Sequence, residues 1–315
     1  MSIRIDQPGL FTTVQDKGRT GYQAFGFSPG GAMDQRALTL SNLLVGNPIG
    51  EAALEMTFLG AAFTFTKSNV IAITGGNGDP TLNGEPVPMY RSVAVKAGDT
   101  VAIGYIHTGC RTYVAFAGGF DLPSPMGSKS TQVKYGLGGH QGRALKMGDE
   151  LAFANPRETL LGMASRSLTP PETPESTVTL RVILGPQADA FTKEGIQTFL
   201  SEPYALTKES DRMGCKLEGL EIAFVKGADI ISDGIAPGSV QVPSSGKPIV
   251  LLCDRQTTGG YAKIATVITV DMPRIAQLKP GDTVRFKSIS VPAAQRLYRR
   301  EKKMYQTLQK KLSKA

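Results

Sequence analysis

The stretch VQVPSSGKPIVLLCDRQTTGGYAKIATV, residues 240–267, carries the alternation that decides the fold. Val240 and Val242 alternate with polar residues, which is the pattern of a half-buried strand. A short apolar run at 248–253 and a β-branched run at 266–270 predict two further strands. Strands separated by turns at such short intervals favour a mainly β chain.

The loop between the last two predicted strands, residues 254–261, is more polar than a turn requires. A turn between strands needs only about two to five residues such as Gly, Asn, Asp or Pro. The sequence DRQTTGGY instead offers a carboxylate, a guanidinium, an amide, two hydroxyls and a phenol. A solvated hairpin tip is one interpretation, and a functional loop is the other, because binding groups are often placed on loops.

Charge is concentrated at one end of the chain. The 315 residues carry a formal net charge of +8, and residues 291–315 hold eight Lys or Arg against one Glu, which is +7. The remainder therefore carries about +1, so we expect no nucleic-acid binding by the body of the protein. The tail itself predicts a basic C-terminal helix with an apolar stripe, whose alternatives are a membrane or nucleic-acid role.

Several kinds of site are not expected. The three cysteines are far apart, and His107 and His140 are not in a metal-ligating spacing, so we expect no metal site. Neither G-x-S-x-G nor a P-loop is present, so any nucleotide site must be built from unmarked surface or by a partner. Without an apolar signal region or a run of transmembrane length, we expect a cytoplasmic protein with no membrane role.

One motif occurs three times, as AVKAGDTVAIG (94–104), ALKMGDELAF (144–153) and QLKPGDTVRF (277–286). Each copy predicts a hairpin that leads into a strand. Two copies precede and one follows a Pro-rich stretch, which indicates two related β units. Residues 144–147, Ala-Leu-Lys-Met, resemble the Ala/Val-Met-Lys-Met signature around a biotinylated lysine. Because the motif recurs at Lys96 and Lys279 without methionine, we interpret Lys146 as a turn residue. We assign a first unit to 1–165, a linker to 166–177, a second unit to 178–290 and the basic helix to 291–315.

The N-terminal region adds a second polar segment. Ser2 to Gln7 alternates as a strand, and the following residues 9–34 are rich in glycine and polar groups. Asp34 is placed to cap a helix that ends near Gly46. Before that helix, Gly30 and Gly31 form either a cradle for an anion or a tight turn.

Polar clusters of this composition suit a carboxylated or phosphorylated ligand and the stabilisation of an oxyanion. Arginines in these clusters could clamp a carboxylate or phosphate, and a surface or intrachain salt bridge is the alternative for each of them. The clusters contain Gln15, Asp16 and Arg19, Gly30 and Gly31 with Asp34, Gly138 and Gly139 with Arg143, Asp211 and Arg212, Gln241, and Asp254 to Tyr261.

Six motifs in order resemble one family: TTVQDKGRTGY (12–22), GGAMD (30–34), LLVGN (43–47), SDRMG (210–214), VQVP (240–243) and DRQTTGGY (254–261). The chain resembles the allophanate hydrolase subunit 2 or biotin-dependent carboxyltransferase family from about Ile3 to Phe286, leaving the basic tail uncovered. The resemblance implies two tandem cyclophilin-like β-barrel subdomains, with a few short helices besides the C-terminal one.

The family's bacterial stand-alone members act in 5-oxoprolinase or as Kip antagonists. The resemblance therefore implies an ATP-dependent opening of 5-oxo-L-proline to L-glutamate, with this chain inactive alone. It implies two partners, an allophanate hydrolase subunit 1-like chain of the Kip inhibitor type and a LamB/YcsF-like chain, with ATP as co-substrate. The alternatives are a regulatory antagonist that binds a Kip-type kinase inhibitor, and a biotin-dependent carboxyltransferase component of a urea carboxylase.

For a planar lactam or amide substrate, we predict two groups of residues that face one another across the ligand. The predicted catalytic residues are Asp254, Gln256, Tyr261 and Arg19. The predicted substrate-binding residues are Gln15, Asp16, Gly30, Gly31, Asp34, Arg212, Gln241, Thr257 and Thr258.

Overall fold

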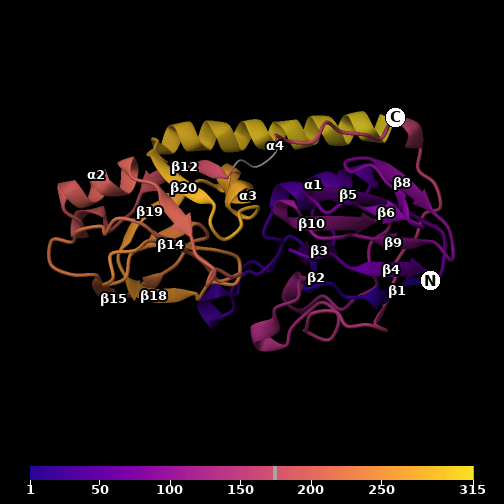
Figure 1. Cartoon of the computed structure of the whole chain (residues 1–315), viewed down its shortest axis with the longest axis horizontal. Helices are drawn as coiled ribbons and strands as arrows, with labels where there is room; N and C mark the ends of the chain where they lie inside the picture. The colour runs from indigo at the N-terminus through magenta and orange to yellow at the C-terminus, as the bar shows by residue number, and fades with distance from the viewer. Residues whose placement is uncertain (173–175, 315) are drawn as a thin grey trace. The chain divides into compact units, whose positions relative to one another are not determined.

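Figure 1 shows the computed structural model of the chain, which describes residues 1–172 and 176–314. The chain divides into two compact units. Unit 1 comprises residues 1–20, 30–173 and 303–315, and unit 2 comprises residues 21–29 and 174–302. The short segment 21–29 thus belongs to unit 2, although it lies inside the first unit predicted from sequence, residues 1–165. The predicted domain boundaries stay a prediction.

Unit 1 contains two antiparallel sheets. The six-stranded sheet has the order β11-β1-β4-β9-β6-β7, and the five-stranded sheet has the order β2-β3-β10-β5-β8. The first is formed by β1 (Ser2–Gln7), β4 (Ala62–Phe65), β6 (Thr81–Leu82), β7 (Glu85–Pro86), β9 (Thr100–Ala102) and β11 (Glu150–Ala152). The second is formed by β2 (Phe11–Gln15), β3 (Ala53–Thr57), β5 (Asn69–Asn77), β8 (Ser92–Val95) and β10 (Thr108–Phe116).

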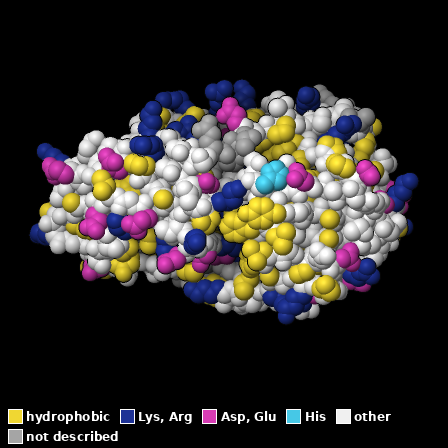
Figure 2. All heavy atoms as spheres, viewed as in Figure 1, with side chains coloured by type: hydrophobic (Ala, Val, Ile, Leu, Met, Phe, Trp, Pro, Cys, Tyr) yellow, Lys and Arg dark blue, Asp and Glu magenta, His cyan; other side chains and the backbone are white. Residues whose placement is uncertain are grey.

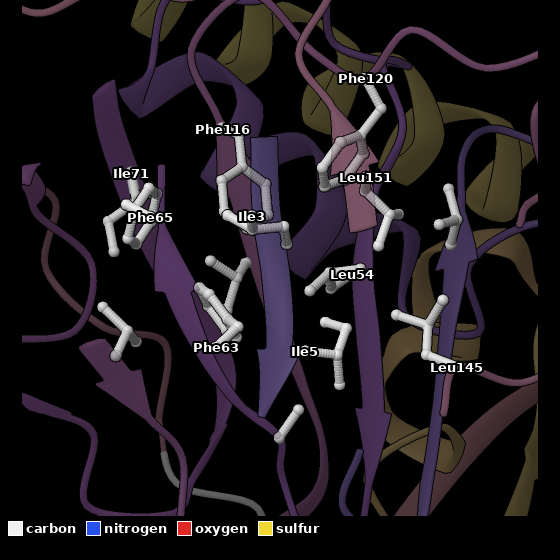
Figure 3. Close-up of a cluster of buried hydrophobic side chains, with 14 of the residues drawn as sticks. Ile3, Ile5, Leu54, Phe63, Phe65, Ile71, Phe116, Phe120, Leu145 and Leu151 are labelled. Atoms are coloured by element: carbon white, nitrogen blue, oxygen red, sulfur yellow. The ribbon is translucent and has the colours of Figure 1, made fainter. Parts of the chain in front are cut away.

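The core of unit 1 is aromatic and aliphatic, and both sheets contribute to it (Figure 3). Ile3 and Phe63 come from the first sheet, and Leu54 and Phe116 from the second; all four are fully buried. The rings of Phe63 and Phe116 lie 5.7 Å apart in an edge-on arrangement, which their quadrupoles favour. Each such side chain contributes about 1.5–3 kcal/mol through burial, so this core holds the loops of unit 1 in place.

Helix α1 (Gln35–Leu44) packs against the five-stranded sheet, where Leu38 joins a second core cluster with Ala53 and Tyr113. The predicted cap is confirmed, because Asp34 Oδ1 accepts a hydrogen bond from Ala37 N at 2.8 Å. Gly46, with φ of +72°, follows the helix end, as its position in the sequence predicts.

The threefold motif forms the same turn in each copy. An aspartate side chain accepts a hydrogen bond from the backbone N–H of the lysine three residues earlier, and the glycine between them has φ of 85–95°. The bonds are 2.7 Å for Lys96–Asp99, 2.7 Å for Lys146–Asp149 and 2.8 Å for Lys279–Asp282. A strand follows each copy, as predicted, but the hairpin is wrong, since β8 pairs with β5 and β9 with β4 in different sheets. The first copy thus carries the chain from one sheet of unit 1 to the other.

Unit 2 is a closed barrel of seven strands in the order β12-β19-β16-β17-β14-β13-β20, in which β12 runs parallel to β20. Its strands are β12 (Thr177–Leu184), β13 (Tyr204–Leu206), β14 (Gly214–Glu218), β16 (Ser239–Gln241), β17 (Ile249–Leu251), β19 (Lys263–Val267) and β20 (Thr283–Ser288). Closure leaves no free edge among these strands. Together with the two sheets of unit 1, the barrel confirms the predicted mainly β fold class.

A two-stranded sheet accompanies the barrel, formed by β15 (Asp229–Gly234) and β18 (Thr258–Tyr261). Half of the predicted polar loop 254–261 is therefore a strand. The strand predicted at 266–270 after this loop is present but starts and ends earlier, as β19 at Lys263–Val267, and a 3-10 turn follows it.

The remaining helices are short except for the last. The α-helices are α2 (Lys193–Ser201), α3 (Met272–Ile275) and α4 (Val291–Lys314). The 3-10 turns are η1 (Gln23–Phe25), η2 (Pro125–Gly127), η3 (Val133–Tyr135), η4 (Met163–Ser165), η5 (Ala188–Ala190) and η6 (Thr269–Asp271).

Arg166, at the start of the predicted linker, is a buried anchor of unit 1. Its guanidinium donates to the carbonyls of Leu43 at 2.9 Å and Leu44 at 2.7 Å, which end α1, and to Leu312 O in α4. A cation at helix C-terminal carbonyls satisfies acceptors that have no partner within the helix. Burial lowers the pKa of this guanidinium from its usual value. The linker's residues 173–175 lie outside the described residues.

Candidate functional site

The predicted site residues fall into two groups, one in each unit. Unit 1 contains Gln15, Asp16, Arg19, Gly30, Gly31 and Asp34, and unit 2 contains Arg212, Gln241, Asp254, Gln256, Thr257, Thr258 and Tyr261. The predicted arrangement of the two groups on opposite sides of a ligand stays a prediction.

Asp16 is the centre of the first group and uses its carboxylate within the chain. Its Oδ1 accepts from Ser128 Oγ at 2.7 Å, Ser130 Oγ at 2.5 Å and Gly18 N at 2.7 Å. Its Oδ2 accepts from Lys129 N at 2.6 Å. The side chain is 8% exposed. The carboxylate thus fastens the segment 128–130 to the end of β2.

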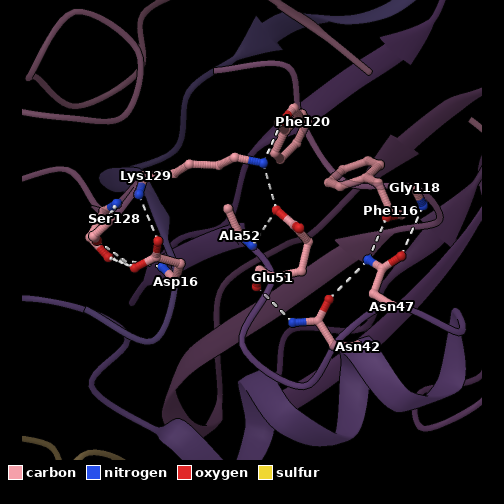
Figure 4. A network of polar contacts seen from close by, with 11 residues as sticks. Asp16, Asn42, Asn47, Glu51, Ala52, Phe116, Gly118, Phe120, Ser128 and Lys129 are labelled. Atoms are coloured by element: carbon pink, nitrogen blue, oxygen red, sulfur yellow. Dashed lines mark hydrogen bonds and ion pairs between the residues drawn. The ribbon is translucent and has the colours of Figure 1, made fainter. Parts of the chain in front are cut away.

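This fastening continues into a longer polar network, which Figure 4 shows. Lys129 Nζ donates to Glu51 Oε1 and to Phe120 O, both at 2.8 Å. Glu51 O accepts from Asn42 Nδ2 at 2.7 Å, and Asn42 Oδ1 accepts from Asn47 Nδ2 at 3.0 Å. The network therefore links the Asp16 loop to helix α1, as expected of a scaffold.

Arg19 and Gln15 contact the same segment. Arg19 is 1% exposed and donates to Gln132 Oε1 at 3.0 Å and to Ser130 O at 2.7 Å. Gln15 Nε2 donates to Thr131 O at 3.0 Å. Within the described part of the chain, Gln15 Oε1 and Thr131 Oγ1 are buried without a hydrogen-bond partner.

The glycine pair before α1 has a left-handed backbone conformation. Gly30 and Gly31 have φ of +61° and +88°, and a Cβ on Gly31 would lie 2.8 Å from Gly18 N, so both positions favour glycine. The chain supplies its own anion beside the helix start, because Glu55 Oε2 accepts from Met33 N at 2.8 Å.

Tyr113 completes this arrangement. Its hydroxyl donates to Glu55 Oε2 at 2.6 Å and accepts from Asp34 N at 2.8 Å. Burial, followed by the negative charge of Glu55, raises the pKa of Tyr113 well above its usual value. The N–H groups of Met33 and Asp34 are therefore bonded within the chain, which argues against a cradle for a bound phosphate at this helix start.

The second group begins with an ion pair that joins two predicted residues. Arg212 donates through Nε to Asp254 Oδ2 at 2.7 Å and through Nη2 to Oδ1 at 3.3 Å. The side chains are 11% and 17% exposed, respectively. A backbone bond from Asp254 N to Arg212 O at 3.0 Å runs beside the pair. These contacts hold the start of the DRQTTGGY segment against the SDRMG segment.

Two glutamine amides meet at Gly259. A Cβ on Gly259 would lie 2.8 Å from Gln241 Nε2 and 2.9 Å from Gln256 Nε2, so a larger residue there would displace both amides. Gln241 is buried and donates to Tyr261 O at 3.2 Å, whereas Gln256 is exposed. The structure thus brings together two amides that lie apart in the sequence.

The exposed groups of this region are on and before β18. Gln256 and Thr258 are exposed, Tyr261 is 40% exposed, and Thr257 is half-buried. They present an amide, hydroxyls and a phenol, which can donate and accept hydrogen bonds without a net charge. Such a surface can pair with both the C=O and the N–H of an amide.

Two supporting residues of unit 2 were not predicted. Gln23 Oε1 accepts from Arg255 Nη2 at 3.1 Å, and Gln23 Nε2 donates to Thr257 O at 3.2 Å. The buried Lys263 donates to Asp233 Oδ2 at 2.8 Å, which joins β15 to the barrel and lowers the pKa of Asp233. Burial lowers the pKa of Arg255. No sequence signal marks Gln23, whose partners are more than two hundred residues away.

Outside these groups, Arg143 forms a two-pronged pair with Asp149, at 2.6 and 2.9 Å, and His140 Nε2 lies 3.3 Å from the same carboxylate. Arg143 therefore forms an intrachain salt bridge, which was the alternative to clamping a carboxylate or phosphate ligand. Among residues 1–172 and 176–314, no group of His, Cys, Asp and Glu could hold a metal ion. In the same ranges, no helix has the length and apolar character needed to cross a membrane.

The chain is similar in sequence and in structure to several known proteins. The sequence model described as "Carboxyltransferase domain, subdomain A and B" matches residues 25–288. The C subunit of the Escherichia coli 5-oxoprolinase is 35% identical over 97% of this chain and 97% of its own length. The urea amidolyase of Lachancea kluyveri is 32% identical over 98% of this chain and 18% of its own length. The crystal structure of the K. lactis urea amidolyase has a TM-score of 0.91 at 30% identity, over 98% of this chain and 20% of that one.

Proposed function

The chain belongs to the family of carboxyltransferase domains with subdomains A and B, and from this premise we propose that it acts as the C subunit of an ATP-dependent 5-oxoprolinase. The observation that carries the proposal is the match to the C subunit of the Escherichia coli 5-oxoprolinase over 97% of both chains. The urea amidolyases match only a small part of their own length.

The proposed reaction opens the lactam of 5-oxo-L-proline to L-glutamate. Water adds to the ring carbonyl carbon, the C–N bond breaks, and the nitrogen becomes the amine of glutamate. A lactam carbonyl is a poor electrophile, so the hydrolysis of ATP supplies the driving force. ATP is the proposed co-substrate of the whole complex, with two partner chains of the allophanate hydrolase subunit 1-like and LamB/YcsF-like types.

In this proposal, the exposed groups around β18 contact the substrate. The Gln256 amide can donate to the lactam C=O and accept from its N–H, and Thr258 and Tyr261 can add hydroxyl contacts. Hydrogen-bond donors near the carbonyl oxygen would stabilise the charge that develops there during ring opening. Thr257 contributes its backbone carbonyl to Gln23 and so orients the loop.

Asp254 has a different role in this proposal from the catalytic one predicted from sequence. Its carboxylate is bonded to Arg212, so it positions the loop. Gln241 supports the loop from inside the fold through Tyr261 O. In unit 1, Asp16 and Arg19 are buried and bonded to the segment 128–132, so they are positioning residues there.

The test is a reconstitution in which the chain is combined with its two proposed partners and each component is omitted in turn. Hydrolysis of ATP that depends on 5-oxo-L-proline is measured together with glutamate. We expect turnover only with all components and none from the chain alone. Gln256→Ala should reduce turnover at least tenfold, whereas the exposed control Gln197→Ala on α2 should leave it unchanged.

If the complex forms but turnover does not require the chain, the enzymatic proposal fails and a regulatory role as a Kip-type antagonist replaces it. One observation favours a different enzymatic role, namely the TM-score of 0.91 to a urea amidolyase. That alternative is a carboxyltransferase that uses biotin on another chain. Transfer of carboxylate from carboxybiotin to urea, with no lactam opening, would support it.

A further inference from the structure

Helix α4 presents a line of positive charge to solvent. Seven of its cationic side chains are exposed among the described residues, and Figure 2 shows dark blue side chains along the edge where Figure 1 draws α4. All but Lys302 lie on one side of the helix, namely Arg296, Arg299, Arg300, Lys303, Lys310 and Lys311. At 3.6 residues per turn, all six point into about one third of the helix circumference. We refer to these six residues as the basic stripe; from Arg296 to Lys311 it is about 22 Å long at 1.5 Å per residue.

The opposite side of α4 is apolar and packs on the protein. Leu312 is 3% exposed, and Leu297 and Leu308 are half-buried. The contact from Arg166 to Leu312 O fastens the end of the helix within unit 1. Met304 on the same side is 42% exposed, so the protein covers this side in part, and the basic stripe faces outward on the other side.

Acidic residues of the described chain do not form ion pairs with the basic stripe. Glu301 is the one acidic residue within α4, and its place five residues after Arg296 turns it away from the stripe, by about 140°. No member of the stripe forms an ion pair with a residue that the structure describes. Like charges three and four residues apart destabilise a helix. An anionic partner would relieve this repulsion.

We propose that the basic stripe docks an acidic helical segment of a partner protein. A helix with Glu or Asp at positions i, i+3, i+4 and i+7 has the same rise per turn as α4, so its charges can pair along the whole stripe. A membrane surface fits less well, because three of the leucines on the apolar side of α4, Leu297, Leu308 and Leu312, pack on the protein and are not free to enter a bilayer. A nucleic acid fits less well, because the rest of the chain carries a charge of only about +1.

The test uses labelled helical peptides of about 21 residues and the full-length chain. One peptide carries its glutamates in a single line, and its isomer has the same composition with glutamates on all sides. Fluorescence anisotropy measures binding at about 50 mM and 500 mM salt. We expect the single-line peptide to bind at least fivefold more tightly than its isomer, and to weaken about tenfold at high salt.

Neighbouring lysines provide matched variants. Lys303→Glu alters the stripe, and Lys302→Glu makes the same change on another side of the helix, where Lys302 lies over the ring of Tyr298. We expect about a threefold loss for Lys303→Glu, at least tenfold for Arg299→Glu/Lys303→Glu/Lys310→Glu, and less than twofold for Lys302→Glu. Circular dichroism checks that each variant keeps its helix content.

Several results would overturn the proposal: equal binding of the two peptides, equal losses for the two lysine variants, or no binding of the single-line peptide. Tighter binding to a 20-base-pair DNA duplex would assign the stripe to nucleic acid instead. Tighter binding to vesicles containing phosphatidylserine would assign it to a membrane surface.

Discussion

The polar groups around Asp16 and those around β18 are similar in composition but differ in burial and in bonding. Asp16 and Arg19 are buried, and their partners are groups of the same chain. Gln256, Thr258 and Tyr261 leave their side chains accessible. A dense polar motif in a sequence can therefore either stabilise the fold through buried hydrogen bonds or form a surface that binds a ligand. Substitutions can separate these two roles, because the first should change stability and the second activity.

The largest effect on stability is expected from Asp16→Ala. The change leaves two serine hydroxyls and the N–H groups of Gly18 and Lys129 without their acceptor in a buried place. We expect the free energy of unfolding to fall by about 3–5 kcal/mol. Urea denaturation measures this loss, and Asp121→Ala, at an exposed aspartate, is the control. A loss below 1 kcal/mol would show that the hydrogen bonds of Asp16 do not stabilise the fold.

A smaller effect is expected from Arg212→Met, which removes the partner of Asp254. The pair is only partly shielded from water, so we expect unfolding to become easier by about 1–2 kcal/mol. Turnover of the complex should fall more than this stability loss explains, because the loop that carries Gln256 loses its support. Unchanged turnover in a fully folded Arg212→Met variant would show that the ion pair does not support the proposed site.

The pair of Arg143 and Asp149 predicts a dependence on pH. Hydrogen bonding from Arg143 lowers the pKa of Asp149 to about 2 from a usual value of 3.8. A lowered pKa in the folded state means that the contribution is complete above about pH 4 and is lost as the pH falls through about 2. We expect Arg143→Met to lower the free energy of unfolding by about 1–2 kcal/mol at pH 7.

The difference between the wild type and Arg143→Met should shrink between pH 4 and pH 2, as measured by urea denaturation across that range. A difference that stays constant down to pH 2 would contradict the assigned cause of the pKa shift.

Local patterns in the sequence were enough to predict much of the fold. Asp34 before an apolar stripe marks the start of α1, and the recurring Lys-x-Gly-Asp frame marks three identical turns, because both depend on groups a few residues apart. Pairing between distant segments could not be predicted in the same way. The strand β18 contains two glycines, which weaken strand propensity, and it forms through its partner β15.

The candidate site shows the same limit. The segments around Asp16 and Asp254 stand out by composition, but their bonding partners do not. Ser128 and Ser130 lie more than one hundred residues from Asp16, and Gln23 lies more than two hundred from Arg255. Whether a polar side chain is buried and satisfied depends on these partners, so sequence alone assigned Asp16 and Gln256 to the same kind of site.

The proposal that the surface around β18 contacts the lactam is tested most directly by measuring stability and turnover together in Gln256→Ala. Gln256 is exposed, so its truncation should change the free energy of unfolding by less than about 0.5 kcal/mol. The reconstituted complex should nevertheless lose at least tenfold in kcat/KM for 5-oxo-L-proline. Normal stability with full turnover would contradict the proposal that the surface around β18 contacts the lactam.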